Sequence, residues 1–328
     1  MLALIEITAW HYAGFIAAVL VFLALDLGVF HREAHVVQFR EALGWTTLWF
    51  AMAMAFAGLL KVNRPPGEAI EFVTGYIVEL SLSMDNVFVI ALIFAYFRVP
   101  LAQQHRVLFW GILGALVMRG VMIGAGAALI QQFHWLLYVM GGFLVYTGIK
   151  MLCVDDEGVH PEQNLFIKLA RKFFPVTQAF DGDRFVTRLD GRTALTPLAL
   201  VLVMVETTDL IFAVDSIPAI FAVTQKPFII FTSNVFAILG LRSLYFVLAG
   251  AIGFFRYLKM GLSIVLVFIG VKMLLVIWAI QIPSGVSLAI VLGIILLSMA
   301  ASIAAARREG KHLPDDNAPA EPPAPAAK

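Results

Sequence analysis

Acidic and small polar residues interrupt two strongly apolar stretches of this chain. Both stretches carry the same pattern, which is an acidic residue, an aspartate six residues later and a small polar residue directly after it. The pattern is formed by Glu79, Asp85 and Asn86 in the first stretch and by Asp209, Asp215 and Ser216 in the second. A carboxylate in the apolar interior of a membrane is costly and therefore indicates a functional site by default. We interpret the two stretches as the two halves of one ion site.

The chemistry of these side chains favours a hard cation. Carboxylate, amide and hydroxyl oxygens suit Mn²⁺, Mg²⁺ or Ca²⁺, whereas Cu and Zn favour His and Cys ligands. None of the seven His residues lies in the middle of a predicted membrane span. With about 100° of rotation per residue, Glu79 and Asn86 share one helix face and Asp85 lies to its side. The candidate ligands are Asp85, Asn86, Asp215, Ser216, Glu79, Asp209, Glu206 and Asn234.

The composition is that of a membrane protein. Of the 328 residues, 61% are hydrophobic and only 14% are charged, whereas a soluble domain carries roughly a quarter charged residues. The mean hydropathy of +0.91 agrees with this class. The single cysteine, Cys153, excludes an internal disulfide and a Cys-rich metal site. We therefore expect an all-α polytopic membrane protein with membrane lipid and a divalent cation as partners, no resident cofactor and no nucleic acid.

Nine segments are apolar over the length of about 20 residues that a helix needs to cross a bilayer. They lie near residues 10–30, 41–60, 70–96, 106–131, 134–153, 195–222, 228–254, 261–281 and 285–306. The first segment lacks a basic region and an evident cleavage site, so we expect it to be retained rather than removed as a signal peptide. The tail over residues 308–328 is rich in Pro and Ala and is expected to be disordered.

Lys and Arg residues predict the orientation of the chain. Residues 154–193 form the one long polar segment between predicted spans, and they are rich in Lys and Arg. If this segment is cytoplasmic, most of the other Lys and Arg residues that flank the spans lie on the same side. Because cytoplasmic loops are enriched in Lys and Arg, we expect the N-terminus outside and the C-terminus in the cytoplasm.

The third to fifth spans and the sixth to eighth spans carry matching features in the same order. Each set has the acidic pattern, then an arginine (Arg119 or Arg242), then a Gly-x-Lys-Met-Leu motif that begins at Gly148 or Gly270. Three crossings separate the sets, so the second enters the membrane from the opposite side. Many secondary transporters are built from such inverted-topology repeats, with the substrate site near the bilayer midplane. The predicted units are 1–69 (two N-terminal spans), 70–153 (first three-helix repeat), 154–193 (cytoplasmic loop), 194–281 (second three-helix repeat), 282–307 (last span) and 308–328 (tail).

Several residues inside the spans have two open interpretations. Arg119 and Arg242 either balance the charge of the empty site or hold helices together. Asn234 is either an accessory ligand or an interhelical hydrogen-bonding group. Pro218 cannot donate a hydrogen bond to the carbonyl of Val214, and it therefore frees an oxygen close to the second acidic pattern.

Three motifs carry a resemblance to the TerC family of bacterial inner-membrane proteins. They are Ser83-Met-Asp85-Asn86-Val-Phe-Val, Ala213-Val-Asp215-Ser216-Ile-Pro218-Ala-Ile-Phe221 and Thr232-Ser-Asn234-Val-Phe-Ala-Ile-Leu-Gly-Leu-Arg242. The resemblance covers residues 10–305 and is closest to the alkali-inducible Alx branch. It implies a manganese exporter of the inner membrane, related in fold to the lysine exporter superfamily, with the acids of the two patterns as ligands. The preference for Mn²⁺ over Ca²⁺ or Mg²⁺ comes from the resemblance alone.

A carboxylate site in a membrane repeat favours ion transport as the function. Carboxylates that share a low-dielectric site repel each other, so some bind protons until a cation displaces them. We therefore expect a proton-coupled exporter of a divalent cation and no enzymatic activity. Two alternatives stay open: a non-transporting stress-response or redox-modulating scaffold that uses residues 154–193, and an intramembrane aspartyl protease with two catalytic aspartates. The chain lacks Gly-x-Gly-Asp and Tyr-Asp motifs, which argues against the protease.

Overall fold

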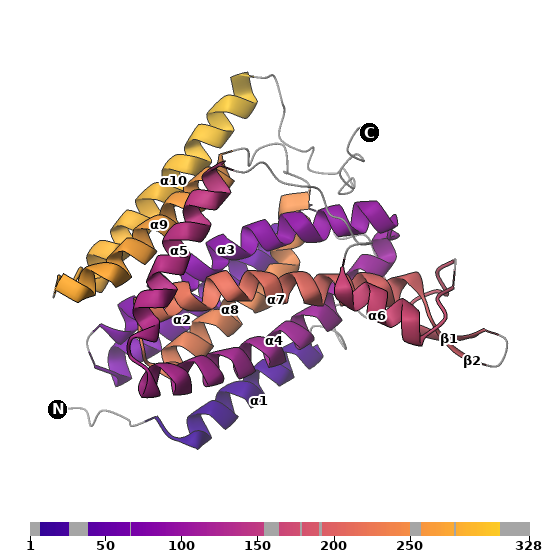
Figure 1. Cartoon of the computed structure of the whole chain (residues 1–328), viewed down its shortest axis with the longest axis horizontal. Coiled ribbons are helices and arrows are strands. Elements are labelled where there is room, and N and C mark those ends of the chain that lie inside the picture. The colour runs from indigo at the N-terminus through magenta and orange to yellow at the C-terminus, as the bar shows by residue number, and fades with distance from the viewer. Residues whose placement is uncertain are drawn as a thin grey trace.

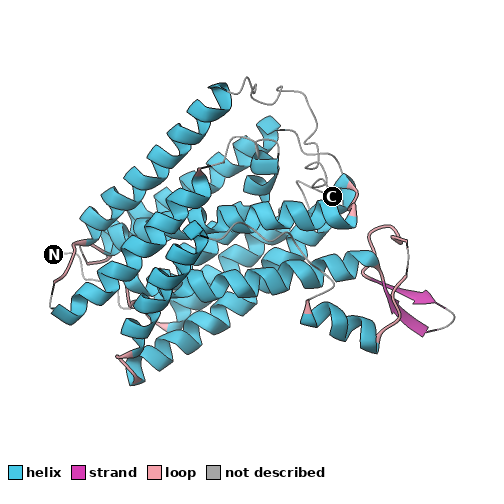
Figure 2. Ribbon diagram, turned by 45° about the horizontal axis from the view of Figure 1, so that its top comes forward, coloured by secondary structure: helices cyan, strands magenta, loops and turns pink. Residues whose placement is uncertain are grey.

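The structure, a computed structural model, consists almost entirely of helices. It describes residues 7–25, 39–65, 67–153, 164–177, 179–189, 192–249, 257–278 and 280–308. The helices are α1 (Ala9–Leu25), α2 (Phe39–Asn63), α3 (Glu68–Phe97), α4 (Leu101–Gln132), α5 (Leu136–Cys153), α6 (Leu165–Phe173), α7 (Pro197–Val223), α8 (Pro227–Ala249), α9 (Leu258–Leu275), the 3₁₀ helix η4 (Val276–Trp278) and α10 (Ser284–Arg308), with the strands β1 (Val186–Leu189) and β2 (Arg192–Leu195) (Figure 1). Figure 2 shows that the two strands form a small hairpin at one end of the helical body.

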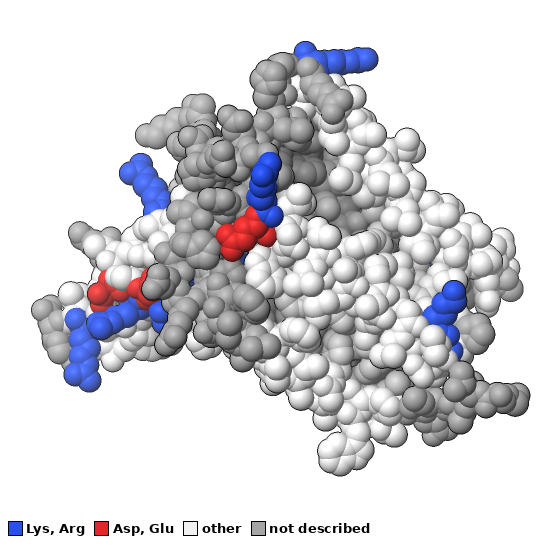
Figure 3. Space-filling view, turned by 180° about the vertical axis from the view of Figure 1, so that it is seen from behind, with Lys and Arg blue, Asp and Glu red and all other residues white. Residues whose placement is uncertain are grey.

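Eight helices in the described part of the chain are long and apolar enough to cross a membrane. They are α2, α3, α4, α5, α7, α8, α9 with η4, and α10, and they coincide with the last eight predicted spans. The first predicted span, near 10–30, is described only to residue 25, and there α1 is a shorter apolar helix. Figure 3 shows a face with a broad area free of charged side chains among the described residues. The all-α polytopic membrane class is therefore confirmed.

A tight turn joins α3 to α4. Arg98 takes the left-handed conformation with φ 51°, and its N–H donates to the Ala95 carbonyl at 3.2 Å. The N–H of Val99 donates to the Phe94 carbonyl at 2.9 Å. These two bonds satisfy carbonyls that the end of a helix leaves without partners. Pro100 then precedes α4, where a missing N–H costs nothing, so the chain reverses within three residues.

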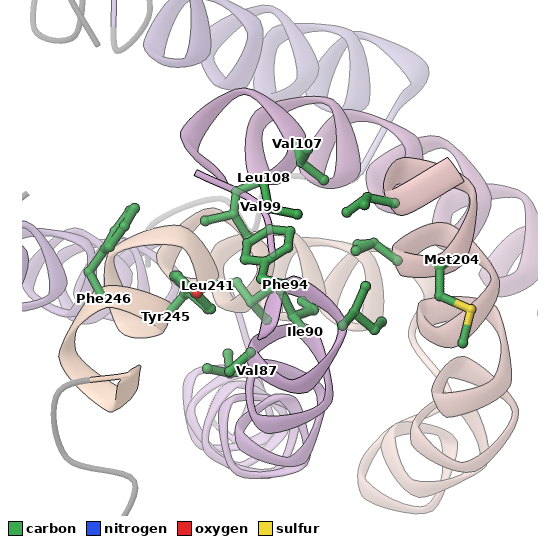
Figure 4. Close-up of a cluster of buried hydrophobic side chains, with 14 of the residues drawn as sticks. Val87, Ile90, Phe94, Val99, Val107, Leu108, Met204, Leu241, Tyr245 and Phe246 are labelled. Atoms are coloured by element: carbon green, nitrogen blue, oxygen red, sulfur yellow. The ribbon is translucent and has the colours of Figure 1, made fainter. Parts of the chain in front are cut away.

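A buried apolar cluster fixes four helices around the predicted site. Phe94 of α3, Leu108 of α4, Met204 of α7 and Tyr245 of α8 belong to this cluster (Figure 4). The rings of Phe94 and Tyr245 meet edge to face with centroids 5.4 Å apart, a favoured aromatic geometry. Because α3, α4, α7 and α8 share one core, the polar residues that they carry have defined neighbours.

Helices α5 and α9 pack closely against each other through residues without large side chains. A Cβ added at Gly270 would lie 2.7 Å from the Gly141 carbonyl oxygen, and one added at Gly148 would lie 2.8 Å from the Ser263 carbonyl oxygen. If Gly148 and Gly270 are equivalent in the predicted repeat, Gly141 and Ser263 are equivalent as well, seven residues before each of them. The contact of Gly270 with Gly141 then corresponds to the contact of Gly148 with Ser263, with the two repeats interchanged. A two-fold relation between the repeats requires this correspondence. This pattern supports the inverted repeat, which stays a prediction.

The polar segment 154–193 contains regular structure in its described part. Helix α6 is capped by Asn164, whose Oδ1 accepts from the N–H groups of Phe166 and Ile167 at 2.9 and 3.1 Å. Strands β1 and β2 pair antiparallel, with Val186 opposite Leu195. The hairpin leads directly into α7, whose first residue is Pro197 and whose cap is Thr196. The sequence predicted only a loop here, because a nine-residue helix is too short to give a clear periodicity.

Candidate ion-binding site

Arg119 of α4 is the centre of a buried ion-pair cluster. Its side chain is 2% exposed and pairs through Nη1 with Glu79 of α3. Its Nη2 donates to Asp209 Oδ1 at 2.8 Å and its Nε donates to Asp209 Oδ2 at 3.3 Å. The guanidinium therefore binds this α7 carboxylate in a bidentate manner. Nη1 also lies 3.4 Å from the hydroxyl oxygen of Ser216. One guanidinium thus joins residues from both halves of the predicted site.

Oxygen atoms without a hydrogen-bond partner line the same face of α3. Glu79 Oε2, Ser83 Oγ and Asn86 Oδ1 are buried and have no hydrogen-bond partner among the described residues. They are spaced four and three residues apart and therefore share one side of the helix. Asn86 Nδ2 donates to Asp209 Oδ1 at 2.8 Å, so this side faces the arginine cluster. An unpartnered buried polar group costs about 1–3 kcal/mol, and three together indicate a surface that binds a polar ligand.

Asn234 of α8 extends this set of oxygens. It is 1% exposed, and both its amide oxygen and its amide nitrogen lack a partner among the described residues. Helix α8 packs along α3, and Ser233 Oγ lies 3.0 Å from where a Cβ on Gly75 would stand, one turn before Glu79. Asn234 is therefore near the level of the carboxylate cluster. Its alternative role as an interhelical hydrogen-bonding group finds no partner in the described residues.

The two aspartates of the acidic patterns, Asp85 and Asp215, take no part in the described contacts of Arg119. Asp215 is half-buried and lies near Thr147 and Lys150, both on α5. Asp85 is half-buried on α3, and it lies about 100° round the helix from Asn86. The sequence favoured Asp85 and Asp215 as ligands, whereas the described contacts with Arg119 come from the acids six residues before them. Thr147 and Lys150 were not predicted as site residues.

Glu206 is the third carboxylate near the cluster. It is half-buried on α7 and close enough to Asp209 to interact electrostatically. Its carboxylate lies directly against Gly114 of α4, at the place where any other residue would carry its Cβ. A glycine on α4 therefore makes room for an acid on α7. Sequence reasoning missed Gly114 because nothing within α4 distinguishes it from the other glycines of that helix.

Arg242 has different surroundings from Arg119, although the repeat predicts the two to be equivalent. Its Nη2 contacts His105 Nε2 at the start of α4. With Trp45 and Trp49 of α2 it also lines a small cavity of about 30 Å³. Of the two arginines, Arg119 is the one whose described contacts include carboxylates of the predicted site.

The donor atoms suit a hard divalent cation, but Arg119 holds two of the carboxylates. Within the described residues, no three Asp, Glu, His or Cys side chains converge in a way that could hold a metal ion. Glu79 and Asp209 both point at the guanidinium, which supplies one of the two positive charges that a divalent cation would bring. Cation binding at these acids would therefore require Arg119 to withdraw from at least one of them.

Comparison with known proteins agrees with this membrane architecture. The model of the integral membrane protein TerC family matches residues 65–310, which include every helix of both predicted repeats. The chain belongs to the TerC family. No solved structure matches the chain, so the arrangement around Arg119 has no experimental counterpart among them.

The relatives of this TerC protein are bacterial membrane proteins of similar length. An uncharacterised membrane protein of Myxococcus xanthus is 51% identical over 309 residues, which cover 94% of this chain and 95% of the relative. Alx of Salmonella typhi and Alx of Escherichia coli K12 are 46% and 45% identical, and each match covers 88% of this chain and 92% of the relative. Their names propose a membrane-bound redox modulator. Neither these names nor the family description denotes an enzyme.

Proposed function

We propose that this TerC protein exports a divalent cation, Mn²⁺ first among them, from the cytoplasm across the inner membrane of a bacterium. The observation that carries the proposal is the buried cluster in which one guanidinium holds Glu79 and Asp209. Carboxylates at the middle of membrane helices are retained for function rather than for stability. The buried oxygens of Ser83 and Asn86 without partners add the neutral ligands that a hard cation needs.

In this proposal Arg119 acts as a tethered substitute for the cation. It keeps Glu79 and Asp209 neutralised while the site is empty, because two bare carboxylates in a low-dielectric interior are costly. An entering cation attracts the same carboxylates and releases the guanidinium. When the cation leaves on the other side, Arg119 returns. Exchange of the singly charged guanidinium for a divalent cation keeps the charge of the buried site constant only if one proton leaves at the same time.

Proton coupling follows from the third carboxylate. Glu206 lies near Asp209, and Arg119 is the one described cation that pairs with the cluster. Like charges at short distance favour proton binding to one of them. A cation that binds at these acids releases that proton, which gives a route to antiport.

The choice of Mn²⁺ and the direction of transport rest on other grounds. Oxygen ligands are compatible with Mn²⁺, Mg²⁺ and Ca²⁺ alike, and the TerC resemblance favours Mn²⁺. The excess of Lys and Arg around residues 154–193 favours an outside N-terminus and a cytoplasmic C-terminus. In this orientation export carries the cation from the α6 side towards the Glu71 side of the molecule.

A second candidate function comes from the names of the relatives. Alx of Escherichia coli is named as a proposed membrane-bound redox modulator, which corresponds to a scaffold that does not transport. That function requires no change of charge at Asp209 and instead requires a partner surface outside the membrane. It predicts that neutralising the buried acids leaves the function of the protein unchanged, whereas deletion of residues 164–195 abolishes it.

The deciding experiment measures Mn²⁺ uptake into inside-out membrane vesicles with an acidic lumen. Wild-type protein is expected to load the vesicles, and Asp209→Asn is expected to reduce uptake to background while the protein still folds. Asp183→Asn serves as the matched control, since Asp183 is an exposed aspartate of the hairpin region. Background uptake by folded wild-type protein, or full uptake by Asp209→Asn, overturns the export proposal.

A further inference from the structure

Helix α6 presents a row of large apolar side chains that the protein does not cover. Leu165 and Phe173 are 70% and 67% exposed, and Phe166 and Leu169 are each 48% exposed. At about 100° per residue these four side chains fall within an arc of roughly 100° on one side of the helix. Four exposed apolar side chains on nine residues exceed what scattered surface residues explain, and such patches mark contact sites.

The basic residues of α6 gather on a second side. Lys168, Arg171 and Lys172 are all exposed, and they follow one another around the helix next to the apolar arc. Ile167 occupies the third side, is 1% exposed and packs into the core cluster shared by α3, α4, α7 and α8. One side of α6 thus binds the protein, one is apolar and one is positively charged.

The position of α6 places these sides at the ends of the membrane helices. Figures 1 and 2 show α6 beside the hairpin, at the end of the helical body where α7 begins. Asn164 ties the start of α6 to α7, because its Nδ2 donates to Met204 Sδ at 3.3 Å. Arg106 of α4 lies 5.6 Å from the ring centroid of Phe185 and 3.8 Å from Asp183, which fixes the same region against α4.

We propose that α6 lies in the cytoplasmic surface of the membrane and binds acidic phospholipid headgroups. An interfacial helix buries its apolar side at the boundary of the acyl chains and keeps its basic side among the headgroups. The cytoplasmic leaflet is negatively charged, so Lys168, Arg171 and Lys172 have the complementary charge. The proposal rests on the proposed orientation and not on the transport of any ion.

A short chain of contacts connects α6, where we propose that lipid binds, to the candidate ion site. Asn164 contacts Met204, and Met204 precedes Glu206 by two residues on α7. A helix held by the membrane keeps this end of α7 in place relative to the bilayer. Acidic lipid that holds α6 in place therefore also holds the first turns of α7, which precede Glu206 and Asp209.

The test measures the depth of α6 in the membrane without any metal. A Cys153→Ser, Leu169→Cys protein carries a fluorophore at position 169 and is placed in nanodiscs of phosphatidylcholine, with or without phosphatidylglycerol. Nitroxide lipids report burial in the bilayer surface, and iodide reports exposure to water. With phosphatidylglycerol, lipid quenching is expected to be strong and iodide quenching weak.

Charge variants decide whether the headgroups are responsible. Arg171→Gln with Lys172→Gln removes two positive charges from α6, and Arg184→Gln with Arg188→Gln removes two from the neighbouring hairpin region. Each basic residue near an anionic surface contributes about 1 kcal/mol, so the first pair is expected to weaken lipid contact roughly thirty-fold. The hairpin pair is expected to leave it unchanged.

Three results overturn the proposal. Strong iodide quenching in acidic nanodiscs means that α6 stands in water. Weak quenching by both probes means that protein, such as a second copy of the chain, covers it. Equal lipid quenching with and without phosphatidylglycerol, or in both charge variants, means that headgroup charge has no role. None of these results depends on Mn²⁺ uptake, so failure here is distinguishable from failure of the export proposal.

Discussion

Two ion-pair networks in this protein use the same chemistry in opposite surroundings. The central one joins Arg119 to Glu79 and Asp209, and its arginine is 2% exposed. The outer one lies where α3 and α8 begin, where Lys226 is 46% exposed. Lys226 Nζ lies 3.4 Å from Glu68 and 3.1 Å from Glu71.

Each carboxylate of the outer network has a second partner besides Lys226. Arg64 pairs with Glu68 at 2.8 Å, and the hydroxyl of Thr224 donates to Glu71 at 2.7 Å. Water and salt also compete at an exposed lysine, so such pairs contribute at most about 1 kcal/mol each. After the loss of Lys226, Glu68 keeps its pair with Arg64 and Glu71 keeps its hydrogen bond from Thr224.

In the central network, Arg119 is the described cation for both carboxylates. The charges of this network are desolvated, and breaking a buried pair by removing one partner costs about 3–5 kcal/mol because it leaves an uncompensated charge. A cation at the centre can therefore be exchanged for another cation, but its removal leaves buried carboxylates uncompensated. This is the property that a cation-exchanging site requires.

The largest expected effect is that of Arg119→Met. It leaves Glu79 and Asp209 without their shared cation, so the free energy of unfolding falls by about 3–5 kcal/mol. The measurement is denaturant unfolding of the purified protein in detergent, followed by circular dichroism. Added Mn²⁺ is expected to stabilise this variant more than the wild type, because the cation can take the place of the guanidinium.

The control for that variant is Arg106→Met. Arg106 is also on α4, but its side chain is 45% exposed and its ion pair with Asp183 is 3.8 Å long. Its loss is expected to cost less than about 1 kcal/mol. Similar losses in Arg119→Met and Arg106→Met would remove the distinction between buried and exposed pairs on which the comparison depends.

Asp209→Asn is expected to have the next largest effect. The asparagine oxygen still accepts from Asn86, and Arg119 keeps its pair with Glu79, so stability falls by about 1–3 kcal/mol. Combined with Arg119→Met, the loss is expected to be smaller than the sum of the two single losses, because the second change removes a charge that the first has stranded. Additive losses in the same unfolding assay would show that the two residues do not act as one unit.

Lys226→Met tests the outer network. Stability is expected to fall by less than about 1 kcal/mol, since Glu68 keeps Arg64 and Glu71 keeps Thr224. The difference from wild type is expected to vanish in 1 M salt, where charges are screened beyond about 3 Å. A loss as large as that of Arg119→Met, or one that persists in high salt, would make the outer network structural as well.

The sequence predicted the spans and the meeting of the two acidic patterns because both follow from local rules. Length and hydropathy locate membrane helices, and carboxylates inside them must find partners. The acids that pair with Arg119 did not follow, since the sequence favoured Asp85 and Asp215, whereas the described ion pairs of Arg119 are with Glu79 and Asp209. The packing of the helices, which the sequence does not record, decides this. The unlike surroundings of Arg119 and Arg242 could not be predicted either, because a sequence repeat does not record where symmetry is broken.

The role of a glycine and of a short helix could not be predicted from the sequence for a different reason. Gly114 matters because the carboxylate of Glu206 occupies the space beside it, and that relation exists only between helices. Ser83 lies between Glu79 and Asn86 on one helix face, as the helical spacing predicts, although it was not among the predicted ligands. Helix α6 could be recognised only once its exposed and buried sides were separated, which requires the tertiary structure.

The smallest expected effect on stability, combined with a clear effect on function, belongs to Asn234→Leu. Leucine has nearly the shape of asparagine, and neither amide atom of Asn234 has a described partner to lose. Removing a buried polar group that makes no hydrogen bond is neutral or slightly stabilising, so the free energy of unfolding is expected to stay the same or rise. If Asn234 Oδ1 serves the cation, Mn²⁺ uptake by vesicles falls about tenfold or more, as when a metal site loses a supporting group.

The matched control on the same helix is Thr232→Val. Thr232 is as buried as Asn234, but its hydroxyl donates to the Phe228 carbonyl of its own helix at 2.8 Å, so uptake is expected to be unchanged. Unchanged uptake in Asn234→Leu would confine the site to α3, α4 and α7. Loss of stability in that variant would mean that Asn234 holds helices together, and the central cluster would then differ from the outer network only in depth. Stability kept and uptake lost would instead show that the buried region keeps polar groups for the ion, at positions where apolar ones would serve the fold equally well.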